Sequence, residues 1–222
     1  MNRIPREWLK LTYHRPRIIL NGLRRIQCGG QLNGLPYTIA ALRTRELKPF
    51  LEGRQAALFC HGIGTRIGRE VSFALFESAD YDIVARYEDG GVMRMVPVQL
   101  KELPPSAVNS NVDLQQILDK LGKKLPDSKD LVVAIHLNRD IQGLHTEGLR
   151  IPTGFGQIWL YGGKNHTQQA WSLIGDLLKN SNLVSDFHYP SDMIYSAMWQ
   201  QDIIGRCLGS ISLSFGLNPI CQ

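Results

Sequence analysis

The sequence lacks the features that would mark a membrane-embedded, secreted or zinc-stabilised protein. No apolar run approaches the roughly 18 to 20 residues that a membrane span needs, and the first residues carry several charges instead of a signal peptide's apolar stretch. The four cysteines are scattered and form no C-x-x-C pair, which argues against a disulfide framework or a zinc knuckle. These absences predict a cytoplasmic protein that has no membrane partner.

What is present is an ordinary globular composition with an uneven distribution of charge. The 222 residues are 43% hydrophobic and 20% charged, which is enough to build one domain with a substantial extension. Residues 1–54 hold eleven Lys or Arg against three Glu, a net charge of +8, whereas the rest of the chain holds 14 basic and 17 acidic residues. We therefore predict a basic N-terminal extension over residues 1–54 and an α/β domain over residues 55–222.

The basic extension interleaves arginines with apolar and aromatic residues, as in "YHRPRIILNGLRRIQ". This pattern suits a structured surface that lies against a phosphate backbone, and it makes Arg24 and Arg25 candidate nucleic-acid contacts. The simpler alternative is a solvated basic face that has no partner, because runs of charge often confer only solubility.

Apolar residues at near-helical spacing predict a helix over residues 64–77, with Thr65 as its N-cap. The helix carries Glu70. It also carries Arg66 and Arg69, which either contact phosphates or are merely solvated.

A β-hairpin is predicted over residues 80–102, "DYDIVARYEDGGVMRMVPVQLKE", because "EDGG" is a tight-turn signal between two apolar runs. Side chains two residues apart share one face of a strand, so Gln99 and Lys101 lie on the same side. Asp82 alternates in the same way on the partner strand. An acidic group, an amide and an ammonium are therefore expected to converge on one patch.

The remaining segments predict further helices and strands around this hairpin. Upstream, residues 36–43 are strand-like and residues 44–55 suggest a short helix interrupted by Pro49. Downstream we expect, in order, a helix over 111–125, strands over 131–138 and 156–163, a helix over 167–179, and beyond residue 190 a helix followed by a strand-like tail.

The succession of a helix with Glu, a strand with Asp, a strand ending in Gln-x-Lys, a helix and a strand resembles the PD-(D/E)xK nuclease superfamily. The resemblance covers about residues 64–140 and implies a restriction-endonuclease-like fold, with a mixed central sheet flanked by helices. In that family, a glutamate on the first core helix, an aspartate at the start of a strand and an (E/D/Q)-x-K element form the metal site. Here Glu70, Asp82 and Gln99-Leu100-Lys101 match these positions.

This resemblance implies a Mg²⁺- or Mn²⁺-dependent deoxyribonuclease. Glu70 and Asp82 would bind the metal, helped by the Leu100 carbonyl or the Gln99 amide oxygen, because hard cations prefer oxygen ligands. Lys101 would position or help deprotonate the attacking water and stabilise the developing negative charge. DNA is the expected partner, and a homodimer is an open alternative.

The tripeptide pattern is weak by itself, since it recurs at residues 46–48 and 127–129. Only the copy at 99–101 ends an apolar strand that follows an aspartate-bearing strand across a tight turn. Gln99 departs from the commoner carboxylate and removes one negative charge from the site. A catalytically inactive nuclease-fold module that binds DNA or protein is therefore an alternative.

A second alternative is a dinucleotide-binding βαβ unit in an oxidoreductase. An apolar run leads into Gly62, Gly64 and Gly68, which precede a helical pattern and a strand that ends in acidic residues. Against this interpretation, the chain turns at "EDGG" directly into another strand, where a doubly wound fold continues with a helix.

Several other polar and aromatic residues have simple structural explanations. Asp80 competes with Asp82 for the metal role but falls in the turn "ESAD". His136 lies inside a predicted buried strand and is expected to be a core histidine. Trp159 and Tyr161 are expected to pack in the core and not to stack on bases.

Overall fold

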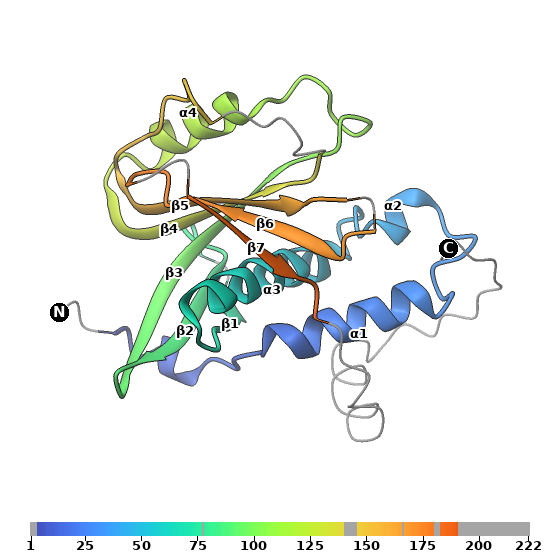
Figure 1. Cartoon of the computed structure of the whole chain (residues 1–222), viewed down its shortest axis with the longest axis horizontal. Coiled ribbons are helices and arrows are strands. Elements are labelled where there is room, and N and C mark those ends of the chain that lie inside the picture. Colours follow the sequence, from blue (N-terminus) through green and yellow to red (C-terminus); the bar gives the residue numbers. More distant parts are fainter. Residues whose placement is uncertain (1–3, 77, 140–145, 166, 180–182, 191–222) are drawn as a thin grey trace.

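The apolar segments of the chain come together in one mixed seven-stranded sheet that curls into a half-barrel (Figure 1). The architecture is that of a computed structural model, which describes residues 4–76, 78–139, 146–165, 167–179 and 183–190. In sheet order, which is also chain order, the strands are β1 (Ser72–Leu75), β2 (Ile83–Asp89), β3 (Val92–Leu103), β4 (Ser128–Leu137), β5 (Phe155–Gly163), β6 (Ala170–Ile174) and β7 (Val184–His188).

Four α-helices and one 3₁₀-helix accompany the sheet in the described part of the chain: η1 (Trp8–Lys10), α1 (Pro16–Cys28), α2 (Tyr37–Ala40), α3 (Lys48–Ile67) and α4 (Leu114–Lys124). α1 and α3 lie on one side of the sheet and α4 on the other (Figure 1). Two apolar clusters, one on each side of the sheet, form the core. The expected α/β class, with a mixed sheet flanked by helices, is confirmed.

The direction of the strands explains where α4 lies. The pairs β1–β2, β2–β3, β5–β6 and β6–β7 are antiparallel, whereas β3–β4 and β4–β5 are parallel. A parallel pair needs a crossover connection, and α4 provides it between β3 and β4. Asp113 caps this helix by accepting a hydrogen bond of 2.7 Å from the Gln116 N–H.

The central elements agree with the sequence predictions. The hairpin over 80–102 is confirmed by β2 and β3, which turn at Gly90 and Gly91 with positive φ at both glycines. The helix over 111–125 corresponds to α4, and the two buried strands over 131–138 and 156–163 correspond to β4 and β5.

The helix predicted over 64–77 is wrong, because α3 begins at Lys48 and ends at Ile67. Pro49 does not interrupt a short helix but occupies its first turn, where a proline costs no hydrogen bond. Gly68 then adopts a left-handed conformation, with φ of 66°, and ends the helix. The chain continues directly into β1.

Two further predicted elements are also wrong. Residues 36–43 contain the short helix α2 and no strand. Residues 170–174 form β6 where a helix was expected over 167–179, because pairing with both β5 and β7 gives this segment extended partners on each side. The predicted helix and strand beyond residue 190 lie outside the described residues.

The glycines of the dinucleotide-binding alternative do not form a loop. Gly62 and Gly64 lie inside α3, and the apolar run before them is helical. A Cβ atom at Gly62 would come within 2.8 Å of the Phe187 ring, so this glycine serves close packing of α3 against β7. The strand–loop–helix arrangement that cradles a pyrophosphate is therefore absent from this part of the chain.

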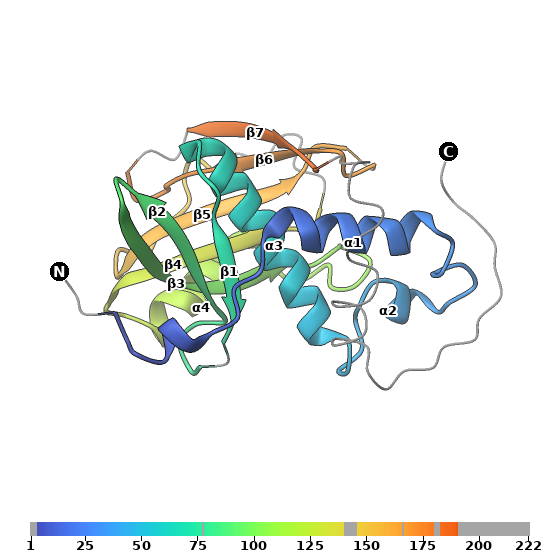
Figure 2. The ribbon, with the colours of Figure 1, turned by 90° about the horizontal axis from the view of Figure 1, so that it is seen from below.

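The basic N-terminal segment is joined to the core of the molecule. α1 packs alongside α3 (Figure 2), and Leu20 is completely buried in the cluster beneath them. The Tyr189 hydroxyl donates a hydrogen bond of 2.8 Å to the Leu20 carbonyl. His14 forms a β-bridge to Phe73 at the outer edge of β1. Residues 8–28 are thus part of the packed structure.

No helix in the described part of the chain is long and apolar enough to cross a membrane.

A partly buried polar network ties the segment before α3 to the end of β3. Both terminal nitrogens of Arg43 donate to the Glu102 carboxylate at 2.6 Å, and the Asn138 amide donates to the same carboxylate at 2.8 Å. His136 is 2% exposed, lies against the rings of Tyr161 and Trp171, and has its Nδ1 atom 3.9 Å from Glu102. Burial, followed by the nearby charge of an arginine, lowers the pKa of His136 to about 3.

This histidine should make the stability of the protein depend on pH. Between about pH 6.5 and pH 3, His136 takes up a proton in the unfolded chain but not in the folded one, so stability falls as the pH drops through this window. We expect a loss of up to about 1.4 kcal/mol per pH unit from this group. Urea unfolding of the wild type at pH 7.5, 6, 5 and 4 should show this slope, and His136→Gln should reduce it. His188→Gln, at an exposed position, is the control. Equal slopes in the wild type and His136→Gln would contradict the prediction.

Candidate active site

Asp82 lies where β2 begins, and its side chain extends the hydrogen-bond ladder between β2 and β3. Its backbone N–H donates to the Val98 carbonyl at 3.0 Å, and its Oδ2 atom accepts a hydrogen bond of 2.7 Å from the Leu100 N–H. The Gln99 amide also donates to Oδ2. The structure therefore brings Asp82 and Gln99 together, and Lys101 follows on the same face of β3.

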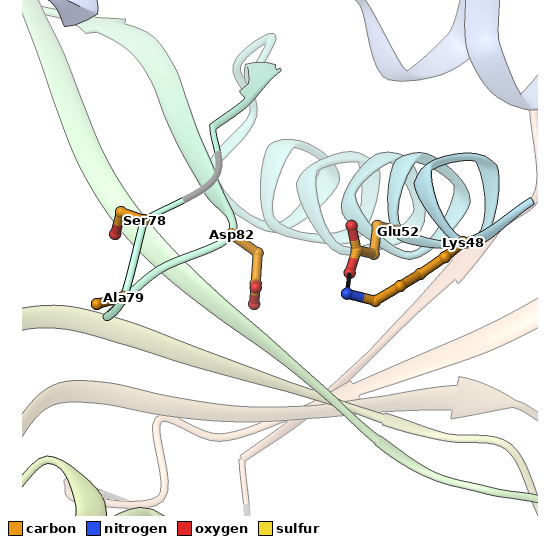
Figure 3. A pocket seen from close by; sticks show the side chains of 5 residues that line it. All are labelled: Lys48, Glu52, Ser78, Ala79 and Asp82. Carbon is orange, nitrogen blue, oxygen red and sulfur yellow. Dashed lines mark ion pairs between the residues drawn. The ribbon is translucent and has the colours of Figure 1, made fainter. Parts of the chain in front are cut away.

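A cavity of about 380 Å³ opens in front of Asp82. Its lining combines the beginning of α3 with the loop that leads into β2: Lys48, Glu52, Ser78, Ala79 and Asp82. Figure 3 shows Asp82 on one side of this space, with Glu52 and Lys48 on the other. Two carboxylates from distant parts of the sequence thus face the same cavity.

Glu52, and not Glu70, is the helical glutamate at this site. α3 ends before Glu70, which is exposed and forms an ion pair of 3.1 Å with Arg15. β1 pairs antiparallel with β2. Leu75, at the end of β1, pairs with Ile83, and Ser72, at the start of β1, pairs with Arg86. At about 3.3 Å per residue, Glu70 lies well over 10 Å from Asp82 along the sheet. The predicted role of Glu70 as a partner of Asp82 is therefore wrong.

A signal for Glu52 exists in the sequence. When Pro49 is interpreted as a first-turn proline, "KPFLEGRQAALFCHGIG" becomes one long helix. Glu52 then lies one turn before the buried Ala56, on the side of the helix that faces the sheet.

Lysine side chains add positive charge beside the two carboxylates. Partial burial lowers the pKa of Lys101, and the ammonium groups of Lys124 and Lys48 act in the same direction, whereas the carboxylates of Asp82 and Glu52 oppose them. All four groups are thus close enough to Lys101 to affect its charge. Lys101 itself is not among the residues that line the cavity.

The loop before β2 is held in place from both sides. The Lys124 ammonium on α4 donates to the Ala79 carbonyl at 3.1 Å. On the other side, the Trp8 indole N–H donates to the Tyr81 hydroxyl at 3.0 Å, and the Tyr81 ring stacks on Phe76. The N-terminal segment therefore supports the loop that carries Asp82.

Of the arginines predicted to bind nucleic acid, Arg24, Arg66 and Arg69 contact side chains of the fold. Their guanidinium groups contact, in that order, the Tyr189 ring at 4.3 Å, the Trp159 ring at 5.1 Å and the Asp89 carboxylate at 2.7 Å. Arg25 is exposed on α1. The structure does not place these arginines among the residues that line the cavity.

The site offers oxygen ligands that suit a hard cation. Glu52 and Asp82 contribute carboxylates, and the Leu100 carbonyl points to the same side of β3 as its N–H, which donates to Asp82. No group of three or more His, Cys, Asp or Glu side chains with metal-site geometry occurs in the described residues. A cation here would therefore rely on two carboxylates, a carbonyl and water, a composition that fits Mg²⁺ better than Zn²⁺.

Gln99 supports Asp82 and does not line the cavity. It is 3% exposed, and its amide nitrogen also lies 3.4 Å from the Leu100 carbonyl. A carboxylate that accepts hydrogen bonds from a backbone N–H and an amide is fixed in orientation, so its other oxygen remains available to a ligand.

Comparisons with family models, with curated proteins and with solved structures find no match, so geometry alone supports a function for this site.

The substitution Gln99→Glu tests whether the Gln99 amide holds the Asp82 carboxylate in place. The change replaces a buried donor to Asp82 by a second carboxylate, so the free energy of unfolding should fall by about 1–3 kcal/mol at pH 7.5. Mg²⁺ or Mn²⁺ should then raise the thermal midpoint of the variant more than that of the wild type. Gln116→Glu, at an exposed position of α4, is the control. A variant as stable as the wild type without metal would show that the amide does not hold Asp82.

Proposed function

We propose that this protein is a metal-dependent nuclease that hydrolyses phosphodiester bonds of DNA and has a restriction-endonuclease-like arrangement of the PD-(D/E)xK type. The observation that carries the proposal is the cavity shared by Glu52 and Asp82, whose carboxylates also act on the charge of the Lys101 ammonium on β3. The succession α3, β1, β2, β3, α4 and β4 contains the helix–strand–strand–helix–strand order that the sequence resemblance implies, with the additional strand β1 after the first helix. Glu52 takes the place first assigned to Glu70.

In this mechanism Glu52, Asp82 and the Leu100 carbonyl would hold Mg²⁺ or Mn²⁺. When bound, the cation supplies charge neutralisation at the phosphate and acidifies a water molecule. Asp82 is kept in position by the Leu100 N–H and the Gln99 amide. Lys101 contacts the scissile phosphate and stabilises its developing negative charge, an interaction that partial burial strengthens.

A second candidate is a nuclease-fold module that binds DNA or protein without cutting it. Two observations favour it. Gln99 stands where the resemblance more commonly has a third carboxylate, and it donates a hydrogen bond to Asp82. Lys48 already neutralises Glu52, with its Nζ atom 3.1 Å from the carboxylate. This candidate keeps the basic surroundings of the cavity but assigns no bond cleavage to them.

Cleavage assays on the variants Glu52→Gln, Asp82→Asn and Lys101→Met test the proposal. Each should lower Mg²⁺- or Mn²⁺-dependent cutting of duplex, branched or single-stranded DNA by roughly 10²-fold or more, because each removes a ligand or a charge at the phosphate. Glu70→Gln is the matched control and should retain activity. If Glu70→Gln is inactive and Glu52→Gln active, the assignment of Glu52 is wrong. If the wild type binds DNA but never cuts it, the binding module replaces the nuclease.

The basic N-terminal segment is best tested by single substitutions. Deleting it would remove Leu20 from the core and confuse loss of binding with loss of folding. Arg25→Gln should weaken DNA binding and reduce the slope of log affinity against log salt concentration by about 1 if α1 contacts a phosphate. Fluorescence anisotropy at several salt concentrations measures this slope. Lys129→Gln, at an exposed position of β4, is the control, and an unchanged slope for Arg25→Gln would mean that this arginine does not contact a phosphate.

A further inference from the structure

Lys48 occupies an unusual position beside the proposed metal ligands. It is the first residue of α3, and its Nζ atom lies 3.1 Å from the Glu52 Oε1 atom, one turn further along the helix. Both residues line the same cavity as Asp82, and Figure 3 shows them facing it. The lysine side chain is 66% exposed, whereas that of Glu52 is 23% exposed.

Helix energetics do not account for a lysine at this position. The positive end of the helix dipole is at the N-terminus, so a cation there is disfavoured. A Lys–Glu pair with the lysine nearer the N-terminus is also the weaker orientation of an i,i+4 pair. The ammonium group is better explained by the negative charge of the cavity that it faces.

The balance of charge at the cavity supports this explanation. Without a metal, Glu52 and Asp82 face each other with two negative charges, and Lys48 neutralises one of them. A divalent cation bound by the same carboxylates would repel the ammonium at close range. Lys48 and a metal ion therefore compete for Glu52.

We infer that Lys48 is an internal counter-ion, which pairs with Glu52 in the metal-free protein and turns to a DNA phosphate when a divalent cation takes its place. This inference rests on the proposed function. The exposed and flexible lysine side chain can make this change without any movement of α3. Lys101 and Lys124 already place positive charge on the same side of the molecule, where a phosphate would approach.

The exchange couples the binding of metal to the binding of DNA. DNA that engages Lys48 frees Glu52 and so raises the affinity for metal. By thermodynamic reciprocity, metal raises the affinity for DNA by the same factor. A protein without the Lys48 charge should bind metal more tightly in the absence of DNA, and DNA should then improve its metal affinity less.

The test is a Mn²⁺ titration of the full chain by calorimetry, with and without a duplex whose phosphorothioate linkages resist hydrolysis. Without DNA, Lys48→Met should bind Mn²⁺ about 5-fold or more tightly than the wild type, in the range of ordinary couplings between sites. With the duplex, the metal affinity of the wild type should rise by a similar factor, and that of Lys48→Met should change little. Lys48→Arg keeps the charge and should behave as the wild type.

Two further variants distinguish a failure of the counter-ion role of Lys48 from a failure of the proposed metal site. Lys129→Met, an exposed lysine paired with Asp127 at 3.8 Å, controls for the loss of a positive charge elsewhere and should leave Mn²⁺ binding unchanged. Glu52→Gln should lose Mn²⁺ affinity with or without Lys48. If Glu52→Gln loses affinity but Lys48→Met equals the wild type, the counter-ion role is overturned and the metal site stands. If Glu52→Gln binds Mn²⁺ as the wild type does, both proposals fail.

Discussion

The hydrogen bond from the Leu100 N–H to the Asp82 carboxylate determines how the candidate site is built. β2 pairs with β3 only as far as Val98, although β3 continues to Leu103. At the point of separation the next backbone N–H of β3 needs a partner, and the Asp82 side chain provides it. The same contact fixes the direction of the carboxylate. The separation of the two strands leaves room for the beginning of α3 to approach, which creates the cavity.

The two charged residues near the end of β3, Lys101 and Glu102, lie on opposite faces of the strand. Lys101 lies on the face of Gln99, whereas Glu102 lies on the face of Leu100, in the direction of α3. Glu102 receives both terminal nitrogens of Arg43, five residues before α3 begins. This partly buried pair anchors the chain just ahead of Lys48. The position of Glu52 relative to Lys101 thus depends on an ion pair that does not itself face the cavity.

The sequence predicts those parts of the fold whose signals are local. The hairpin was predictable from "EDGG" between apolar runs, and α4 from its apolar spacing. The start of α3 was missed because Pro49 has opposite meanings inside a helix and in its first turn. That single error moved the helical glutamate from residue 52 to residue 70. β6 was missed because its extended form depends on pairing with β5 and β7, which no local pattern encodes.

The bridge between His14 and Phe73 has a consequence for the solubility of shortened chains. β1 is an edge strand of only four residues. On its outer side, the Phe73 carbonyl accepts a hydrogen bond from the His14 N–H, and the Phe73 N–H donates one to the His14 carbonyl. An edge with unpaired N–H and C=O groups is a template on which another chain can add a strand. The segment before α1 therefore shields the sheet from self-association. A chain that starts after this segment would present an open edge, with the exposed Leu75 at its end, to its neighbours.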